Sequence, residues 1–243
     1  MSKENSMSNY HNGGDHRKCP LNVRVNLPIV DFDRYYTEKE STISFDTLHL
    51  DRERTALIVI DVWERHHNEG WFARAEENIR TKMLPLVDFI RKSGIPIIHI
   101  PHEFETYGIH PEVRPPDGSE PVVLRSVSCP KCQDVSDIFA ESREVAIKDY
   151  DIDVLSRGLR DHDITTLLYA GYASNWCMLH RDAGIITMKK LGFNIVFVRD
   201  CSLAMEMPET LEGELAHKVI TQMIECQYGP STTLADLTEA LDS

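Results

Sequence analysis

From residue 55 onward, short apolar runs alternate with segments whose apolar positions recur at helical spacing. The runs are rich in β-branched residues and are bounded by polar residues or glycine, which is typical of buried parallel strands. They lie at 56–60, 95–100, 144–148, 165–170 and 194–199. The helical segments lie at 75–93, 154–161, 178–191 and 211–226, and residues 231–240 add a last short strand and helix. This alternation predicts βαβ units in one three-layer α/β/α domain, with a mostly parallel, Rossmann-like sheet of about six strands.

The first 50 residues follow a different pattern, because they are polar and lack sustained periodicity. We therefore predict a polar N-terminal arm over residues 1–50 and a single domain over residues 51–243. Two pieces of the arm, NLPIV and STISFDTLHL, have enough apolar character to dock as short extended segments, whereas the part before about Asn26 is expected to be mobile or draped over a neighbour.

The segment between the second and third apolar runs predicts little regular structure. Residues 101–120 are rich in proline, glycine and charge, and predict a long loop. A short strand at 122–127 and a short helix at 133–140 are expected after it. Because long loops beside the carboxyl edge of a sheet usually shape the site, residues 101–118 are expected to form much of a pocket.

The charge balance narrows the classes of partner. The chain has 26 Lys and Arg against 39 Asp and Glu, a net charge of -13. No basic stripe offsets this charge, which argues against nucleic acid or an anionic membrane as the main partner. No apolar run approaches the roughly 18–20 residues of a membrane span, and the N-terminus lacks the apolar core of a secretory signal. We expect a soluble, cytoplasmic protein whose six cysteines are mostly free thiols.

Three candidate catalytic residues directly follow predicted strands or lie just beyond one. Asp61 follows LIVI, Lys148 follows EVAI, and Cys177 lies shortly after TTLLYAG. Because the carboxyl ends of parallel strands share one edge, the three side chains can converge. A thiol at a helix N-terminus beside an ammonium group is favoured as the thiolate, and a carboxylate can accept its proton. Each residue alone also fits a structural role, as a helix cap, a surface charge or a buried apolar side chain.

The same segments carry a family resemblance. The succession LIVIDVW, EVAIKDY and LLYAGYASNWCMLH resembles the isochorismatase-like cysteine hydrolases, which include nicotinamidase and N-carbamoylsarcosine amidohydrolase. The resemblance covers roughly residues 52–237. It implies a catalytic triad of Asp61, Lys148 and Cys177 and no cofactor. It also implies a cis peptide bond between Tyr172 and Ala173, which would aim the N–H groups of Ala173 and Cys177 at an oxyanion. A homo-oligomer with active sites near subunit contacts is implied as well.

The sequence departs from the family pattern around the pocket. Residues 62–67 replace the usual segment after the aspartate, residues 151–154 replace a small-plus-Phe segment, and the helix after Cys177 is expected to run about one turn longer before Gly192. These changes leave the substrate open. The candidate substrate-binding residues are Trp63, Tyr172, Trp176, His102 and Tyr150.

Metal and redox sites are weaker hypotheses. His99, His102 and His110 lie near the pocket segment but lack the spacing of a ligand set, so no metal is predicted. Cys129 and Cys132 form a single CxxC, which by itself is weak evidence for a redox or zinc site.

The predicted function is hydrolysis of an amide, ureido or carbamoyl C–N bond in a small molecule through a Cys177 thioester. Two alternatives stay open at this point. One is isochorismatase-type hydrolysis of a vinyl ether, and the other is a thiol redox or sensor protein that performs no hydrolysis.

Overall fold

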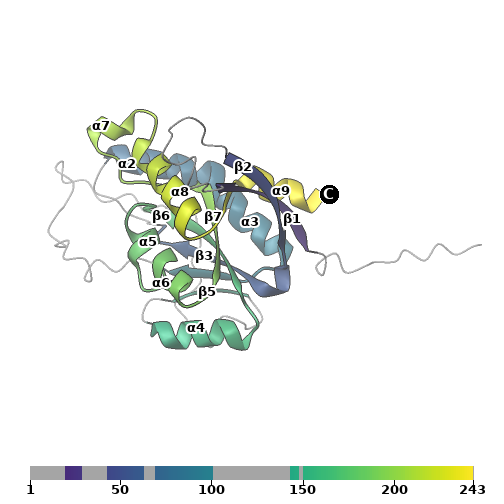
Figure 1. Cartoon of the computed structure of the whole chain (residues 1–243). Helices are drawn as coiled ribbons and strands as arrows, with labels where there is room; N and C mark the ends of the chain where they lie inside the picture. Colours follow the sequence, from purple (N-terminus) through teal and green to yellow (C-terminus); the bar gives the residue numbers. More distant parts are fainter. Residues whose placement is uncertain (1–19, 29–42, 63–68, 101–142, 148–149, 243) are drawn as a thin grey trace, which may run out of the picture.

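A central sheet organises the computed structural model, which describes residues 20–28, 43–62, 69–100, 143–147 and 150–242. In this part of the chain the sheet has eight strands in the order β2-β1-β8-β7-β6-β3-β4-β5 (Figure 1). The strands are β1 (Leu21–Pro28), β2 (Ile43–Leu50), β3 (Thr55–Ile60), β4 (Ile97–Ile100), β5 (Glu144–Ala146), β6 (Thr166–Tyr172), β7 (Asn194–Leu203) and β8 (Ser231–Thr232). The six from β8 to β5 are parallel to one another, which confirms the predicted parallel sheet.

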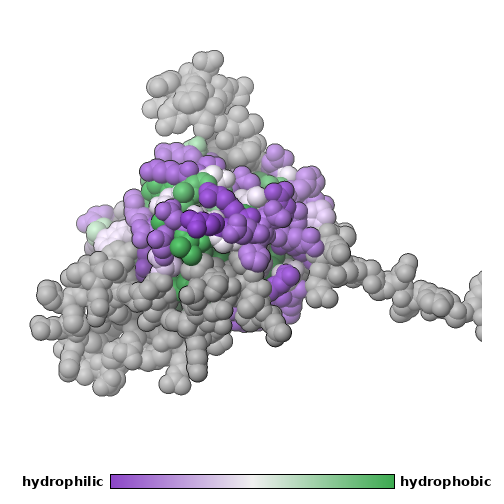
Figure 2. Space-filling model, turned by 90° about the horizontal axis from the view of Figure 1, so that it is seen from below, coloured by the Kyte–Doolittle hydropathy of each residue, from purple (hydrophilic) through white to green (hydrophobic). Residues whose placement is uncertain are grey.

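Helices cover both faces of the sheet and complete the three predicted layers (Figure 1). They are α2 (Glu69–Asn78), α3 (Leu84–Ser93), α4 (Ile152–Asp161), α5 (Cys177–His180), α6 (Ile185–Lys190), α7 (Pro208–Leu211), α8 (Leu215–Gln227) and α9 (Leu234–Asp242). One core contains residues of α2, α3 and α9, and the other contains residues of α4, α5, α6 and α8. The face that carries α4 is mainly hydrophilic in its described part (Figure 2).

Strand β3 shows why the central strands read as continuous apolar runs. Leu57 and Val59 belong to the core beneath α2 and α3, whereas Ile58 and Ile60 belong to the core on the opposite face. Every residue of the strand is buried. Because helices cover both faces, neither set of alternating side chains meets water.

The N-terminal arm contributes more to the fold than its composition predicts. Strands β1 and β2 pair antiparallel over eight residues, and β1 joins β8 at Asn26. Leu21, Val23 and Val25 are buried in the core beneath α9. The expected docking of extended pieces is confirmed for residues 26–28 and 43–50, whereas the expectation that the part before Asn26 is mobile or draped over a neighbour is wrong for residues 21–25. An apolar residue at every second position is enough for a strand with one buried face.

Two predicted helices differ from the structure in their continuity. The segment predicted over 75–93 is helical and ends at Gly94, which has the left-handed conformation of a helix C-terminus. A five-residue π-turn (Ile79–Met83) separates α2 from α3 within it. The helix predicted over 178–191 is broken into α5 and α6. The strand predicted at 122–127 and the helix predicted at 133–140 lie outside the described residues.

A charged cluster fixes the amino edge of the sheet. Glu144, at the start of β5, accepts hydrogen bonds from Arg91 Nε and Nη2 at 2.7 and 2.8 Å. Its Oε1 also accepts from Nε2 of the buried His99 at 2.8 Å. Burial raises the pKa of Glu144, but the hydrogen bonds from His99 and Arg91 outweigh burial and lower it to about 2. The His99 ring is thus hydrogen-bonded to the Glu144 carboxylate. The described residues contain no cluster of three or more side chains that could hold a metal ion.

This cluster predicts a pH-dependent contribution to stability. The folded-state pKa of Glu144 lies below its ordinary value of 4.5, so its stabilisation is present above about pH 5 and disappears as the pH falls towards 2. Glu144→Gln is expected to lower the free energy of unfolding by about 2 kcal/mol at pH 7. Urea unfolding at several pH values should show the deficit shrinking towards pH 2. Glu77→Gln, which breaks an exposed pair with Arg80, should cost less than about 1 kcal/mol. A deficit independent of pH would contradict the assignment.

Candidate active site

Asp61 lies at the carboxyl edge of the sheet, directly after β3. Its carboxylate is fully buried, and its N–H donates to Ile100 O at 3.0 Å. The backbone has a positive φ of 44°, a left-handed conformation that aspartate adopts more readily than most residues. Arg181 donates to both carboxylate oxygens, from Nη2 to Oδ1 at 2.5 Å and from Nε to Oδ2 at 3.2 Å. The structure thus places a buried, two-point ion pair where the sequence predicts a catalytic carboxylate.

Cys177 is the first residue of α5, in the connection that follows strand β6, and it is 5% exposed. Strand β6 pairs with β3 so that Gly171 lies opposite Ile60. A Cβ atom on Gly171, whose φ is 117°, would lie 2.0 Å from Ile60 O, so only glycine allows this approach. The peptide bond between Tyr172 and Ala173 is cis, which is the bond that the resemblance indicates. The connection after β6 therefore starts directly beside the end of β3.

The turn before Cys177 is held by several hydrogen bonds. Ala173 O accepts from the N–H groups of Trp176 and Met178 at 3.0 and 3.1 Å. Asn175 pairs both side-chain polar atoms with the backbone of Met205, donating from Nδ2 at 3.0 Å and accepting at Oδ1 at 2.9 Å. Fixing this turn also fixes the position of Cys177.

A pair made of the buried Ser174 and the half-buried His217 of α8 supports the same turn. Ser174 donates from its hydroxyl to His217 Nδ1 at 3.0 Å, while His217 Nε2 donates to Arg199 O at 3.0 Å. Burial lowers the pKa of His217 below its ordinary value, which favours this neutral ring. The pair is a structural link between β7, α8 and the turn.

Arg181 is the residue of this site that sequence reasoning missed. It follows α5 directly, and its N–H donates to Cys177 O at 3.1 Å. Its side chain is only 11% exposed, and its guanidinium group is directed at Asp61. One residue therefore contacts both the backbone of Cys177 and the carboxylate of Asp61. The signal available in the sequence is an arginine four residues after the proposed nucleophile, one helical turn away.

The predicted pocket residues have different environments. Trp176 is 55% exposed and stands beside Cys177, as a pocket wall would. Tyr150 is half-buried, and its hydroxyl accepts a hydrogen bond from Ala183 N at 3.1 Å. Lys148, Trp63 and His102 lie outside the described residues, as do the CxxC cysteines and His110.

Tyr172 is placed inside the core rather than along a pocket. Its hydroxyl donates to Asn78 Oδ1 at 2.8 Å, and its ring meets Trp71 edge to face, with centroids 5.9 Å apart. Alternation along β6 directs this side chain towards α2, whereas Cys177 belongs to the opposite core. The placement argues against the predicted contact of the Tyr172 ring with substrate.

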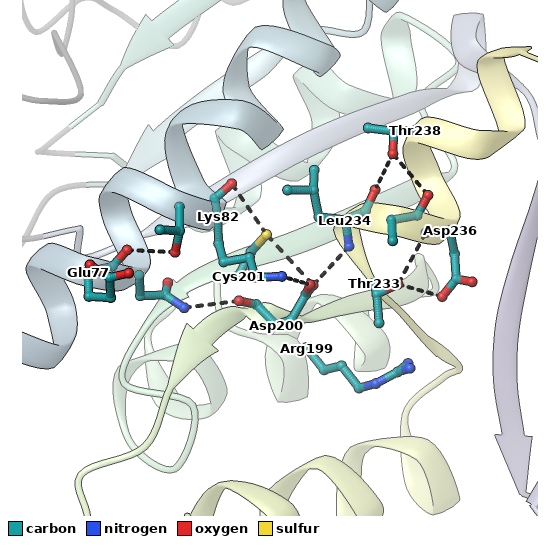
Figure 3. A network of polar contacts seen from close by, with 12 residues as sticks. Glu77, Lys82, Arg199, Asp200, Cys201, Thr233, Leu234, Asp236 and Thr238 are labelled. Atoms are coloured by element: carbon teal, nitrogen blue, oxygen red, sulfur yellow. Dashed lines mark hydrogen bonds and ion pairs between the residues drawn. The ribbon is translucent and has the colours of Figure 1, made fainter.

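A second cluster, within β7, contains an aspartate and a cysteine in a structural role. Asp200 accepts from Lys82 Nζ at 2.9 Å and from the Leu234 N–H at 2.8 Å, which fixes the start of α9 (Figure 3). Cys201, beside it, has its sulfur 3.8 Å from Lys82 O. Burial, with a further contribution from the Asp200 charge, raises the pKa of Cys201 well above its usual value. This buried thiol is therefore poorly suited to be a nucleophile.

Residues 55–225, more than half of the chain, match the model of the isochorismatase domain. A comparison with curated protein sequences gives no match. The fold is similar to a cysteine hydrolase from Pseudomonas syringae pv. phaseolicola 1448A, at a TM-score of 0.52 and 18% identity over 79% of this chain and 94% of that one. An isochorismatase family protein from Burkholderia thailandensis gives a TM-score of 0.50 at 17% identity, over 79% and 97% of the two chains.

The matched region includes β3, β6 and both residues at their carboxyl edge, Asp61 and Cys177. In the described part of the chain, no helix is both long and apolar enough to cross a membrane. The chain belongs to the isochorismatase family of hydrolases.

Proposed function

We propose that this protein hydrolyses an amide, ureido or carbamoyl C–N bond of a small molecule, with Cys177 as the nucleophile. One observation carries the proposal: Arg181 bonds to both the Asp61 carboxylate and the Cys177 backbone, and so ties a buried carboxylate to the start of the helix that carries a cysteine outside any disulfide. Cys177 belongs to an ordered, buried environment, and it stands at the start of a helix, where a thiolate is favoured.

In the proposed first half-reaction, Asp61 accepts the proton of the Cys177 thiol, and the thiolate attacks the substrate carbonyl carbon. The tetrahedral intermediate collapses as the C–N bond breaks, and Asp61 returns the proton to the leaving nitrogen. In the second half-reaction, Asp61 takes a proton from water as the water attacks the thioester. The acid is released, and the proton returns to the Cys177 sulfur. Lys148 is proposed to stabilise the charged forms of both groups.

The oxyanion of each tetrahedral intermediate needs hydrogen-bond donors. We propose the N–H groups of Ala173 and Cys177, which lie on either side of the tight turn that Asn175 and Ser174 hold in place. Losing one such donor typically costs 10²–10³ in rate. The supports of this turn should therefore matter to activity although they do not contact substrate.

The substrate class can be tested with a panel of small amides, ureides and N-carbamoyl compounds, read by release of ammonia or amine. The expected result is turnover of at least one compound by the wild type and none by Cys177→Ala. Alkylation by iodoacetamide at pH 6, mapped to individual cysteines, supplies a second readout. Cys177 is expected to react faster than Cys226, whose pKa is raised by partial burial and by the Glu225 charge. Turnover by Cys177→Ala would contradict the proposal.

Trp176 is proposed as a wall of the substrate pocket, because it is exposed directly beside the nucleophile. Trp176→Ala is expected to raise KM by about tenfold, as the loss of a stacking surface for a small ligand would, with a smaller change in Cys177 alkylation. Tyr172→Phe is the matched control, since the Tyr172 ring is in the core; it should leave KM unchanged and lower stability by about 1 kcal/mol. Steady-state kinetics and urea unfolding of both variants test this. Equal changes in KM would refute the role of Trp176.

Assembly into a homo-oligomer, with active sites close to subunit contacts, is also proposed from the family resemblance. Light scattering at micromolar concentration should give a mass that is a multiple of that of the single chain. A monomeric mass would remove this part of the proposal.

A further inference from the structure

The break between α5 and α6 builds a separate support for the Asp61 carboxylate. A continuous helix over 178–191 would carry the chain past this point without a turn. Instead α5 ends at His180, Arg181 takes an extended ψ of 156°, and α6 starts only at Ile185. Gly184 N donates to Arg181 O at 2.7 Å and closes the turn. At this break the Arg181 side chain meets both oxygens of Asp61.

The turn requires a glycine at residue 184. A Cβ atom there would lie 2.7 Å from Leu179 O and 2.8 Å from Arg181 O, both backbone atoms that cannot swing away as a side chain could. A continuous helix would be more stable with alanine than with glycine at residue 184. Gly184 therefore suits the broken helix and not a continuous one.

Two tyrosines hold the same turn through the backbone of Ala183, one at its carbonyl oxygen and one at its N–H. Tyr169, fully buried on β6, donates from its hydroxyl to Ala183 O at 2.7 Å. Tyr150 accepts from Ala183 N–H at 3.1 Å. Burial raises the pKa of both tyrosines, so the Tyr169 hydroxyl stays protonated and can donate. Side chains from strand β6 and from the segment just before α4 thus fix the residue two positions after Arg181.

Tyr150 is linked to the ion pair through the backbone of the turn. The residue that it bonds, Ala183, lies two positions after Arg181, which bonds both oxygens of Asp61. Turn, tyrosines and ion pair therefore form one cluster at the carboxyl edge of the sheet. A buried two-point arginine–carboxylate contact fixes the orientation of the carboxylate as well as its charge.

We propose that Arg181, held by the Tyr150–Ala183–Tyr169 contacts, is a positioning residue that orients Asp61 towards Cys177. This inference rests on the proposed function, in which Asp61 moves the protons. It adds a basic residue to the set of Asp61, Lys148 and Cys177. It also gives the break between α5 and α6 a function, namely to place the Arg181 side chain beside Asp61. A misplacement of about 1 Å in a reacting group can cost about 10²-fold in rate.

The test compares two bidentate arginine–carboxylate pairs at opposite edges of the sheet, with the amide that the wild type turns over fastest in the panel as the probe. Arg181→Met is expected to lower kcat about 100-fold with KM within threefold of the wild-type value. Arg181→Lys, which keeps the charge, should recover about tenfold of that loss. Arg91→Met breaks the matched pair with Glu144 and should reduce stability while leaving kcat within twofold.

A double-mutant cycle separates positioning from general support. In an Asp61→Asn background, Arg181→Met should lower kcat by less than threefold further, because its effect acts through the carboxylate. A full additional 100-fold loss would overturn the inference, as would an Arg181→Met variant with kcat within threefold of the wild type or a lysine variant no better than the methionine one. If Asp61→Asn itself left kcat unchanged, the proposed function would fail first, and the inference with it.

A second variant covers the case in which Arg181→Met does not fold. Tyr169→Phe keeps Arg181 and Asp61 and removes only the hydroxyl that holds Ala183 O. It is expected to lower kcat five- to tenfold with KM unchanged. Unchanged kcat in a folded Tyr169→Phe protein would overturn the inference.

Discussion

Cys177→Ser is expected to lower kcat by at least about 10⁴-fold on any substrate that the wild type hydrolyses. An alcohol ionises far less readily than a thiol in the same position, and losing the nucleophile of a covalent mechanism typically removes most of the rate enhancement. The Cys177 side chain is buried, and serine differs from cysteine by a single atom, so folding of the variant should be preserved. Steady-state kinetics with the panel substrates, beside thermal unfolding, measure both effects.

Cys201→Ser is the matched control for this loss. Cys201 is also buried and directly follows an aspartate, yet its sulfur lies in the Asp200 cluster (Figure 3). It belongs to the core on the opposite face of the sheet from the core that contains Cys177. Its replacement should leave kcat within about twofold and change stability only. Equal loss of activity in both serine variants would contradict the assignment of Cys177 as the nucleophile.

Asp61→Asn is expected to lower kcat by about 10³-fold, because asparagine cannot accept the thiol proton or deliver one to the leaving nitrogen. The structure adds a second consequence. Asp61 pairs with Arg181 in a buried environment, and leaving the arginine without a carboxylate should lower the free energy of unfolding by about 3 kcal/mol. Kinetics and urea unfolding on one preparation separate the two effects.

Asp200→Asn provides the matched control for that separation. Asp200 pairs with Lys82 and caps α9, so its replacement should destabilise the protein without removing a catalytic proton acceptor. The expected pattern is a loss of stability in both variants and a large loss of kcat only in Asp61→Asn. A folded Asp61→Asn protein with kcat within tenfold of the wild type would exclude Asp61 as the base.

Much of the fold can be predicted from sequence because the central strands are buried on both faces. Runs such as residues 56–60 and 167–170 are apolar at every position, and each is followed by a segment with helical spacing. Strand β1, which lies between β2 and β8, is harder to predict because its signal is a short alternation in which Leu21, Val23 and Val25 are buried. A few alternating apolar residues in a polar segment are also compatible with a loop.

The candidate site could be predicted in part, for reasons that differ between residues. Asp61 and Cys177 are indicated by their place after strands, which parallel topology brings to one edge. Arg181 could not be placed, because helical spacing over residues 178–191 predicts a continuous helix and hides the turn. The close backbone contacts that require glycine at residue 184, and the hydrogen bonds of Tyr150 and Tyr169 to Ala183, depend on packing in the folded chain. The local hydrophobic pattern does not predict them. The prediction that Tyr172 lines the pocket rests on its nearness in sequence to Cys177, whereas the alternation of side chains along β6 turns its ring into the core.

The most direct test of covalent catalysis by Cys177 is mass spectrometry of protein quenched with acid during turnover of an amide from the panel. The account predicts that the peptide containing Cys177 gains the mass of the substrate acyl group. It also predicts that this adduct disappears once substrate is consumed and is absent from Cys177→Ser quenched in the same way. Hydrolysis that proceeds with no acyl adduct on Cys177, and undiminished in Cys177→Ser, would contradict it.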